Sequence, residues 1–265
     1  MKFLNIFINF FKKKNSLIIL KKLLNRFEKN QSEAALEWIK NQPNLSRDKF
    51  MQKDDYKLYL ETKKECEKIK LDADEIISKN VFWQNLIKKE KVAGAAAYEL
   101  LYFLTKKRKP NIIVETGVAA GWSSLAFLRA SKNNDNIKIF SSDFPYFRKK
   151  NPEEYIGILV KNEPNLKNSN LFIEGDEINI PLIIKELKTN KIDLFHYDSD
   201  KSYKGRNFCL RMLKQHFSDN AILIFDDIHN NFHFRDFVQS NNLKFTIIDH
   251  PNYVGIVDLS DQIYG

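Results

Sequence analysis

The sequence predicts an α/β fold built on a doubly wound sheet that is mostly parallel and ends in an antiparallel hairpin. From residue 111 onward, short apolar runs rich in β-branched residues alternate with longer amphipathic runs. This alternation is typical of a parallel sheet covered by helices on both faces. The last two apolar runs, 243–249 and 253–259, are joined by a turn too short to contain a helix. Such a short connection makes these two strands antiparallel.

We expect two parts, a helical N-terminal extension over 1–90 and the α/β domain over 91–265. Residues 1–30 carry apolar side chains at a spacing of three to four, which predicts an amphipathic helix. Residues 31–90 are charged and helix-prone, with a break at Pro43. The apolar side chains that define the first helix are Phe3, Leu4, Phe7, Ile8 and Phe11.

The elements of the α/β domain follow from the same patterns. A helix is predicted over 93–110, because its last turn is cationic and a proline follows. The parallel strands are predicted at 111–115, 137–142, 170–174, 192–197 and 221–225. The helices between and after them are predicted near 122–132, 152–161, 178–189, 203–216 and 231–241.

The net charge of +9 is concentrated at the N-terminus. Residues 1–30 hold eight basic residues and one acid, and the remainder holds 35 basic and 33 acidic residues, a net charge of +2. Enzymes of nucleic acids usually carry a basic face on the body of the protein, so we expect no nucleic-acid partner. The basic N-terminal helix could lie on a membrane surface or pack against protein, including a second copy of the chain, and both interpretations stay open.

Cysteine usage and hydropathy favour a cytoplasmic protein. Cys66 and Cys209 lie far apart in sequence and form no zinc-binding pattern, as expected for ordinary thiols in a reducing compartment. No apolar run approaches the ~20 residues that cross a bilayer. The first residues do not form a signal peptide, because the basic cluster follows the apolar stretch and no small-residue cleavage site comes after it. The protein would be peripheral at the membrane if residues 1–30 bind there.

A glycine-containing loop follows the first predicted strand and has the form E-x-G-x-x-x-G-x-S. Its residues are Glu115, Gly117, Gly121 and Ser123. Glycine lets the backbone approach a ligand closely, and the N-terminus of the following helix favours a carboxylate or phosphate. The dinucleotide pattern GxGxxG is absent. A plain tight turn is the alternative interpretation.

Acidic residues follow the second and third predicted strands. A carboxylate at Asp143 could accept hydrogen bonds from both hydroxyls of a ribose, although a solvated loop residue is the alternative. A polar group in 174–176, such as Asp176, could face an adenine ring. Ligands of such sheets bind beyond the carboxyl ends of the strands. The three strand ends would therefore anchor a carboxylate, a ribose and a base, in that order.

Residues from about 90 to 260 resemble class I methyltransferases, which have a Rossmann-like fold and use S-adenosylmethionine. They are most similar to the metal-dependent O-methyltransferases of the catechol and caffeoyl-CoA types and to bacterial enzymes that methylate sugars. The terminal antiparallel hairpin is a trait of that family. The resemblance implies that the first-loop acid, glycines and serine hold the methionine part of the cofactor and that the next acid binds the ribose. In this sequence the matching residues are Glu115, Gly117, Gly121, Ser123 and Asp143.

An acidic cluster is predicted where the fourth and fifth strands end, with Asp198 and Asp200 after one and Asp226 and Asp227 after the other. Neighbouring strands lie roughly 4.8 Å apart, so these carboxylates should converge. Converging carboxylates repel unless a cation or proton joins them. Oxygen ligands suit Mg²⁺, Mn²⁺ or Ca²⁺. The alternative is that the acids cap helices.

The resemblance assigns these acids. It implies that Asp198, Asp226 and Asp227 are metal ligands and that Lys201, three residues after the first ligand, is the catalytic base. The metal would lower the pKa of a coordinated substrate hydroxyl, and Lys201 would take the proton if its own pKa is lowered. His196 and His229 are the alternative candidates for the base. We expect a small-molecule hydroxyl as acceptor, preferably of a sugar. Candidate substrate walls are Tyr146, Phe147, Tyr155, Phe232, His233 and Phe234.

Three other functions remain open at this point. A metal-independent methyltransferase acting on nitrogen or on nucleic acid would stay active in chelator. An NAD(P)-dependent oxidoreductase is disfavoured by the missing GxGxxG pattern and by the hairpin. A non-catalytic scaffold would have no need of the three acids.

Overall fold

A computed structural model describes residues 31–90, 95–145, 150–249 and 252–261, together with Ser16 and Leu20. The side chains of 86–90 and of Pro152 lie outside this description. The amphipathic helix predicted over 1–30 lies outside the described residues apart from those two positions. None of the described helices is long and apolar enough to cross a membrane.

Within the described residues, eight strands form one sheet in the order β1-β7-β8-β6-β5-β2-β3-β4. All neighbouring strands are parallel except β8, which is antiparallel to both β6 and β7. This confirms the predicted mostly parallel sheet with a closing antiparallel hairpin. The strands are β1 (Asn44–Ser46), β2 (Ile112–Thr116), β3 (Lys138–Ser142), β4 (Ser169–Phe172), β5 (Ile192–Tyr197), β6 (Phe217–Phe225), β7 (Thr246–Asp249) and β8 (Val254–Asp258).

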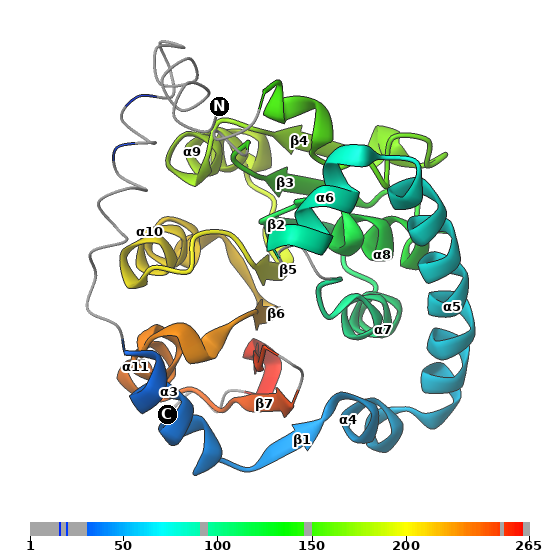
Figure 1. Ribbon diagram of the computed structural model, residues 1–265. Coiled ribbons are helices and arrows are strands. Elements are labelled where there is room, and N and C mark those ends of the chain that lie inside the picture. The colour runs from blue at the N-terminus through cyan, green and yellow to red at the C-terminus, as the bar shows by residue number, and fades with distance from the viewer. Residues whose placement is uncertain are drawn as a thin grey trace.

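Helices cover both faces of the sheet (Figure 1). One face carries α9, α10 and α11, and the opposite face carries α7, α8 and the long helix α5. The α-helices are α3 (Ser32–Lys40), α4 (Arg47–Asp54), α5 (Tyr56–Ser78), α6 (Val81–Glu90), α7 (Tyr98–Arg108), α8 (Trp122–Ala130), α9 (Asp176–Leu187), α10 (Tyr203–Leu213) and α11 (His233–Ser240).

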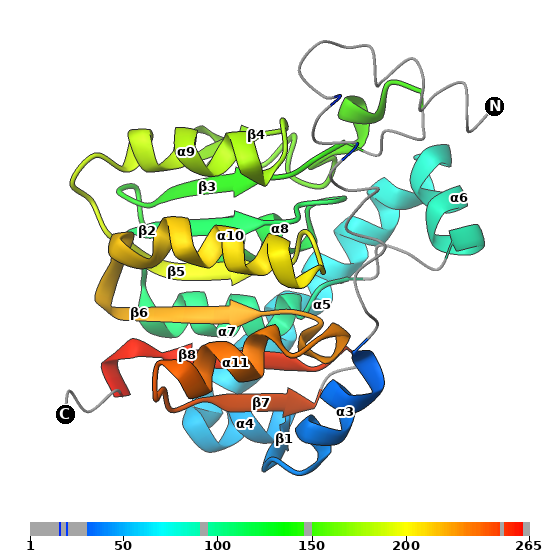
Figure 2. The same cartoon turned by 90° about the vertical axis from the view of Figure 1, so that its left-hand side faces the viewer.

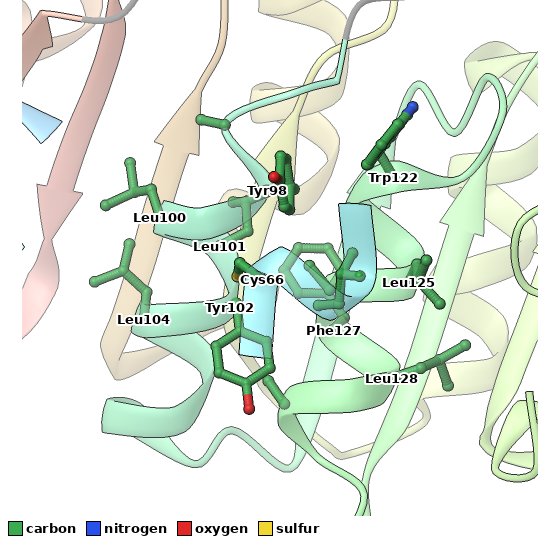
Figure 3. Packing of buried hydrophobic residues seen from close by; sticks show 14 of the residues in the cluster. Cys66, Tyr98, Leu100, Leu101, Tyr102, Leu104, Trp122, Leu125, Phe127 and Leu128 are labelled. Carbon is green, nitrogen blue, oxygen red and sulfur yellow. The ribbon is translucent and has the colours of Figure 1, made fainter. Parts of the chain in front are cut away.

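The alternation of side chains along each strand supplies two cores, one per face. On β2, Ile113 joins the core beneath α7 and α8, while Ile112 and Val114 join the core beneath α9 and α10. Figure 3 shows the first of these cores, where Leu101 of α7 and Phe127 of α8 are both fully buried. Burying such a side chain contributes roughly 1.5–3 kcal/mol, so the two cores hold the strand ends in fixed positions.

Residues 31–90 are built into the same sheet and core. Strand β1 pairs in parallel with β7, and Met51 of α4 and Cys66 of α5 are buried in the core that contains α7. The sequence predicted helices here but not β1, because three residues after a proline carry no strand pattern. Side-chain caps start the two helices that follow, since Ser46 accepts from the N–H of Lys49 and Asp55 from that of Leu58.

Most predicted elements are confirmed to within a few residues, but the helix predicted at 152–161 is wrong. The chain there forms a short 3₁₀ turn, Pro152–Tyr155, and then further turns. Its N–H groups at Gly157 and Leu159 donate to the carbonyls of Ala119 and Ala120 at 2.9 and 3.0 Å. Gly157 itself has a positive φ of 64°. These bonds tie the segment to the glycine loop and leave no helical ladder.

Candidate active site

The parallel strands point to one edge of the sheet (Figure 2). The predicted site residues lie at or after the ends of these strands. The glycine loop after β2 packs against the end of β5. A Cβ at Gly117 would overlap the backbone carbonyl of Asp198, and the φ of Gly117 is +85°. The N–H of Gly117 donates to Ser142 of β3 at 2.8 Å, and the N–H of Asp198 donates to Thr116 at 2.9 Å. Glycine at 117 therefore lets three strand ends meet.

The carboxylate of Glu115 is fully buried and accepts hydrogen bonds from three serine hydroxyls. Ser123 donates at 2.6 Å, Ser124 at 2.5 Å and Ser141 at 2.6 Å. Glu115 and Ser123 were predicted together, and the structure brings them together at the start of α8. Their bonds fix the loop to β3. Contact of either residue with a cofactor stays a prediction.

Asp143 lies at the end of β3 and faces the same loop. Its carboxylate accepts the N–H of Ala119 and that of Phe144, each at 2.6 Å. Ala119 has a positive φ of 48°, so the carboxylate stabilises an unusual loop conformation. The side chain is partly exposed at the sheet edge, the place where a ribose would lie.

Asp176 is buried between two strand ends. Its carboxylate accepts from Ser142 at 2.6 Å and from Ser199 at 2.5 Å, and the residue is 7% exposed. Beside it, the buried side chain of Asn179 donates to Ser142, to Asp143 and to Phe172. Sequence reasoning missed Asn179, since an asparagine inside a helix carries no signal of its contacts.

Of the four acids after β5 and β6, Asp198 and Asp226 lie in one converging group, together with a histidine. Ligand atoms of His196, Asp198 and Asp226 all lie within 4.8 Å of one another. His196 Nε2 is 3.4 Å from Asp226 Oδ2, and the ring is fully buried. His196 lies in β5 and Asp198 directly follows its last residue, two positions on, so the alternation of side chains along the strand directs both to the same side. That period-two spacing was the signal that could have identified His196.

Asp227 lies beside this group and is joined to it by Lys201. The ammonium of Lys201 donates to the Asp198 carboxylate and lies 2.9 Å from Asp227 Oδ2. Burial lowers the pKa of Lys201, but the two carboxylates outweigh burial and the pKa is raised. The lowered pKa that a catalytic base needs is therefore not met in this arrangement. Burial raises the pKa of Asp198 to about 6, although Lys201 opposes the shift.

Two further residues shape this edge. Asp200, one of the acids for which capping was the alternative, accepts the N–H of Ser202 at 2.9 Å in the loop before α10. Arg206 of α10 is 1% exposed and donates to the carbonyls of Asp226 and Asp227. Sequence reasoning missed Arg206, because its charge predicted exposure.

The cluster fits a divalent cation. Lys201 pairs with Asp198 and Asp227, and Arg206 donates to a main-chain carbonyl of the turn that carries Asp226. The three carboxylates outnumber these two cations, which leaves a net formal negative charge. The imidazole of His196 adds a nitrogen donor, which first-row transition metals accept more readily than Mg²⁺ does.

The predicted aromatic substrate walls have varied surroundings. Tyr155 stacks on Phe82 of α6 with ring centroids 3.8 Å apart, and its carbonyl accepts from Trp83 Nε1 at 3.0 Å. Helix α6 thus packs against Tyr155 in the segment after β3, a contact that the sequence did not predict. Phe234 is a core residue, 1% exposed. Tyr146 and Phe147 lie outside the described residues.

Residues 114–228 match the family model of a methyltransferase domain. Over these residues the chain is similar to a methyltransferase domain. The match spans the glycine loop, Asp143 and the acids after β5 and β6. It confirms the predicted methyltransferase, and no curated protein sequence matches the chain significantly.

Solved methyltransferase structures share the fold. The O-methyltransferase TomG from Streptomyces achromogenes, involved in tomaymycin synthesis and solved with SAM, has a TM-score of 0.55 at 13% identity, over 70% of this chain and 89% of TomG. The SAH-bound methyltransferase PaMTH1 from Podospora anserina has a TM-score of 0.54 at 13% identity, over 73% and 88%. The calicheamicin methyltransferase CalS11 has a TM-score of 0.51 at 14% identity, over 73% and 92%.

Proposed function

We propose that this methyltransferase transfers the methyl group of S-adenosylmethionine to a hydroxyl of a small molecule, preferably a sugar, with the help of a divalent cation. The observation that carries the proposal is the convergence of His196, Asp198 and Asp226 at the sheet edge that also holds the glycine loop. The fold is shared with the O-methyltransferase TomG and with the calicheamicin methyltransferase CalS11.

The cofactor would bind across the ends of β2 and β3. Gly117 and Gly121 have φ values of +85° and +103°, so the loop presents backbone where side chains would block approach. Asp143 would exchange its hydrogen bond with the Ala119 N–H for hydrogen bonds with ribose hydroxyls. Glu115, Ser123 and Asp176 would support the cofactor site indirectly. Their hydrogen bonds hold the glycine loop and the ends of the two strands in position.

The acceptor would bind at the ends of β5 and β6. A divalent cation held by Asp198, Asp226 and Asp227, with His196 beside them, would supply Lewis acidity that lowers the pKa of the acceptor hydroxyl. Lys201 reaches over this space and would take the hydroxyl proton on Nζ. It can do so only when Asp198 and Asp227 are engaged elsewhere, because both hold it as an ammonium. Alignment of the acceptor oxygen with the methyl group would then supply much of the rate.

The position of Lys201 favours a second candidate, metal-independent methyl transfer. Its ammonium already lies between Asp198 and Asp227, where it offsets part of their charge. In that case the lysine would serve as the permanent cation of the site, and the acceptor would be activated without a metal.

Methyl transfer from radiolabelled S-adenosylmethionine to a panel of sugars, phenols and small metabolites tests the proposal. We expect activity that is lost in excess EDTA and restored by Mg²⁺ or Mn²⁺. Asp226→Asn should lower turnover far more than Asp200→Asn, because Asp200 caps the loop before α10 while Asp226 belongs to the converging group. Full activity in EDTA would exclude the metal-dependent mechanism and favour the second candidate.

A further inference from the structure

Arg206 is a buried cation whose guanidinium is not used in the mechanism above. It lies on α10, is 1% exposed, and forms no ion pair with a carboxylate among the described residues. Its Nη2 donates to the carbonyls of Asp226 and Asp227 at 2.8 and 3.0 Å. Its Nη1 is buried without a hydrogen-bond partner in the described part of the chain. Burying a guanidinium is costly, so its position needs a compensating interaction.

The two carbonyls belong to the turn that carries two of the acids. Asp227 occupies the left-handed region at φ +55°, a conformation that costs free energy for a non-glycine residue. The turn is held on its other side by the N–H of Ile228, which donates to Tyr253 of the β7–β8 connection at 3.2 Å. The turn is therefore held by hydrogen bonds from two sources, the Arg206 side chain of α10 and the β7–β8 connection.

The surroundings of Arg206 indicate that charge matters as well as hydrogen bonding. The guanidinium carbon lies 5.2 Å from the ring centroid of Tyr197, which is fully buried. In this low-dielectric setting a permanent positive charge beside the acidic turn offsets repulsion among carboxylates. Arginine keeps its proton in proteins, so this charge persists when Lys201 gives up its own.

We propose that Arg206 is a positioning residue that fixes the Asp226–Asp227 turn and offsets its charge, so that both carboxylates can hold a divalent cation. This inference rests on the proposed metal-dependent function. It differs from a merely structural role, because it requires the side chain to set metal affinity while the cofactor half of the site, at β2 and β3, is unaffected.

Isothermal calorimetry with Mn²⁺ alone, and separately with S-adenosylmethionine, tests the inference on the full-length protein. Arg206→Gln removes the charge but keeps a donor, and Arg206→Lys keeps the charge but cannot span both carbonyls. We expect Arg206→Gln to raise the Kd for Mn²⁺ by about 10–100-fold, with Arg206→Lys intermediate. The Kd for S-adenosylmethionine should stay within about threefold of wild type, because a supporting residue of the metal site acts mainly on the metal. Arg211→Gln, on the exposed surface of the same helix, is the matched control and should change neither constant.

Each outcome decides between the claims. If the wild-type protein binds Mn²⁺ and Arg206→Gln binds it equally well, the inference is overturned while the proposed function stands. If the wild-type protein binds no Mn²⁺, the metal-dependent function fails, and this inference fails with it. If Arg206→Gln does not fold, Arg206→Lys decides, and wild-type Mn²⁺ affinity in that variant would leave Arg206 with a structural role only.

Discussion

The charge of Lys201 depends on two neighbours. The carboxylate of Asp198 accepts a hydrogen bond from its ammonium, and Asp227 Oδ2 lies 2.9 Å from Nζ as an ion pair. The lysine is placed where the sequence predicted a base, but its pKa is raised. The position of Lys201 could therefore be predicted from the sequence, but its protonation state could not. The spacing of three residues from Asp198 fixes the position, whereas the protonation state depends on a carboxylate from another strand, which the sequence does not display.

We expect Lys201→Met to reduce turnover by roughly 10²–10⁴-fold, the usual contribution of a general base. Affinity for S-adenosylmethionine should barely change, because Lys201 lies at the ends of β5 and β6 and not at the glycine loop. Lys204→Met is the control, because Lys204 is an exposed lysine in the first turn of α10, three residues after Lys201. Initial rates of methyl transfer at saturating cofactor provide the measurement.

Near-normal turnover of Lys201→Met would remove Lys201 from the mechanism. If His229→Ala then abolished turnover, the base would be His229, whose Nδ1 lies 2.8 Å from the carbonyl oxygen of Asn252 at the hairpin turn. The metal ligands would keep their assignment in that case.

Glu115 illustrates what residue patterns can and cannot predict. Its place at a strand end followed from the apolar run before it, and the glycine loop after it predicted a ligand-binding edge. Its three hydroxyl partners did not follow, because Ser141 comes from another strand and serine is common in any position. Likewise His196 was part of an apolar strand, and only its shared face with Asp198 linked it to the acids.

The elements were predicted best where periodicity is long and regular. Strand β5 has the predicted bounds, because four of its six residues are apolar or aromatic and polar segments lie on both sides. The segment after β3 was predicted as a helix and is not one, because it hydrogen-bonds to the glycine loop, a partner distant in sequence. Tertiary contacts of this kind override local propensity.

The contact between the glycine loop and β5 gives a prediction for the free energy of unfolding. Gly117→Ala should destabilise the protein by more than about 1–2 kcal/mol, the cost of a left-handed conformation alone, because its Cβ would also overlap the Asp198 backbone. Gly157→Ala is the matched control, since its φ is +64° but the nearest atom to an added Cβ is 3.5 Å away. Urea unfolding measures both variants. Equal losses of stability would show that the loop can move away from β5.

The described residues share a single sheet, and one of its two edge strands, β1, comes from the N-terminal part of the chain. Strand β1 covers the edge of β7, and α4 and α5 pack on the face that holds α7. Ion pairs reinforce this attachment, since Glu99 of α7 lies 3.3 Å from Arg47 and 3.2 Å from Lys63. Sequence patterns predicted the extension as helical and placed the methyltransferase resemblance after residue 90. The added strand and the shared core depend on long-range contacts that no local pattern encodes.

Two N-terminal truncations separate the attached part of the extension from residues 1–30. Removing 1–54 takes away β1 and α4, including Met51, whose burial contributes roughly 1.5–3 kcal/mol. It also exposes the edge of β7, and an open strand edge promotes association between molecules. We therefore expect this truncation to lower the Tm markedly and to aggregate. Removing only 1–30 should leave the Tm and S-adenosylmethionine binding unchanged, because every described strand and core residue remains.

We propose that residues 1–30, with a net charge of +7, contact an anionic membrane surface or a second copy of the chain. The shorter truncation should then lose either flotation with phosphatidylserine vesicles or the oligomeric state of the full chain in size-exclusion chromatography. Vesicles of neutral phosphatidylcholine are the control for the first arm, since only anionic lipid attracts the basic segment. A 31–265 protein that fails to fold would instead make the first 30 residues part of the core, and unchanged flotation and oligomeric state would refute the proposed contact.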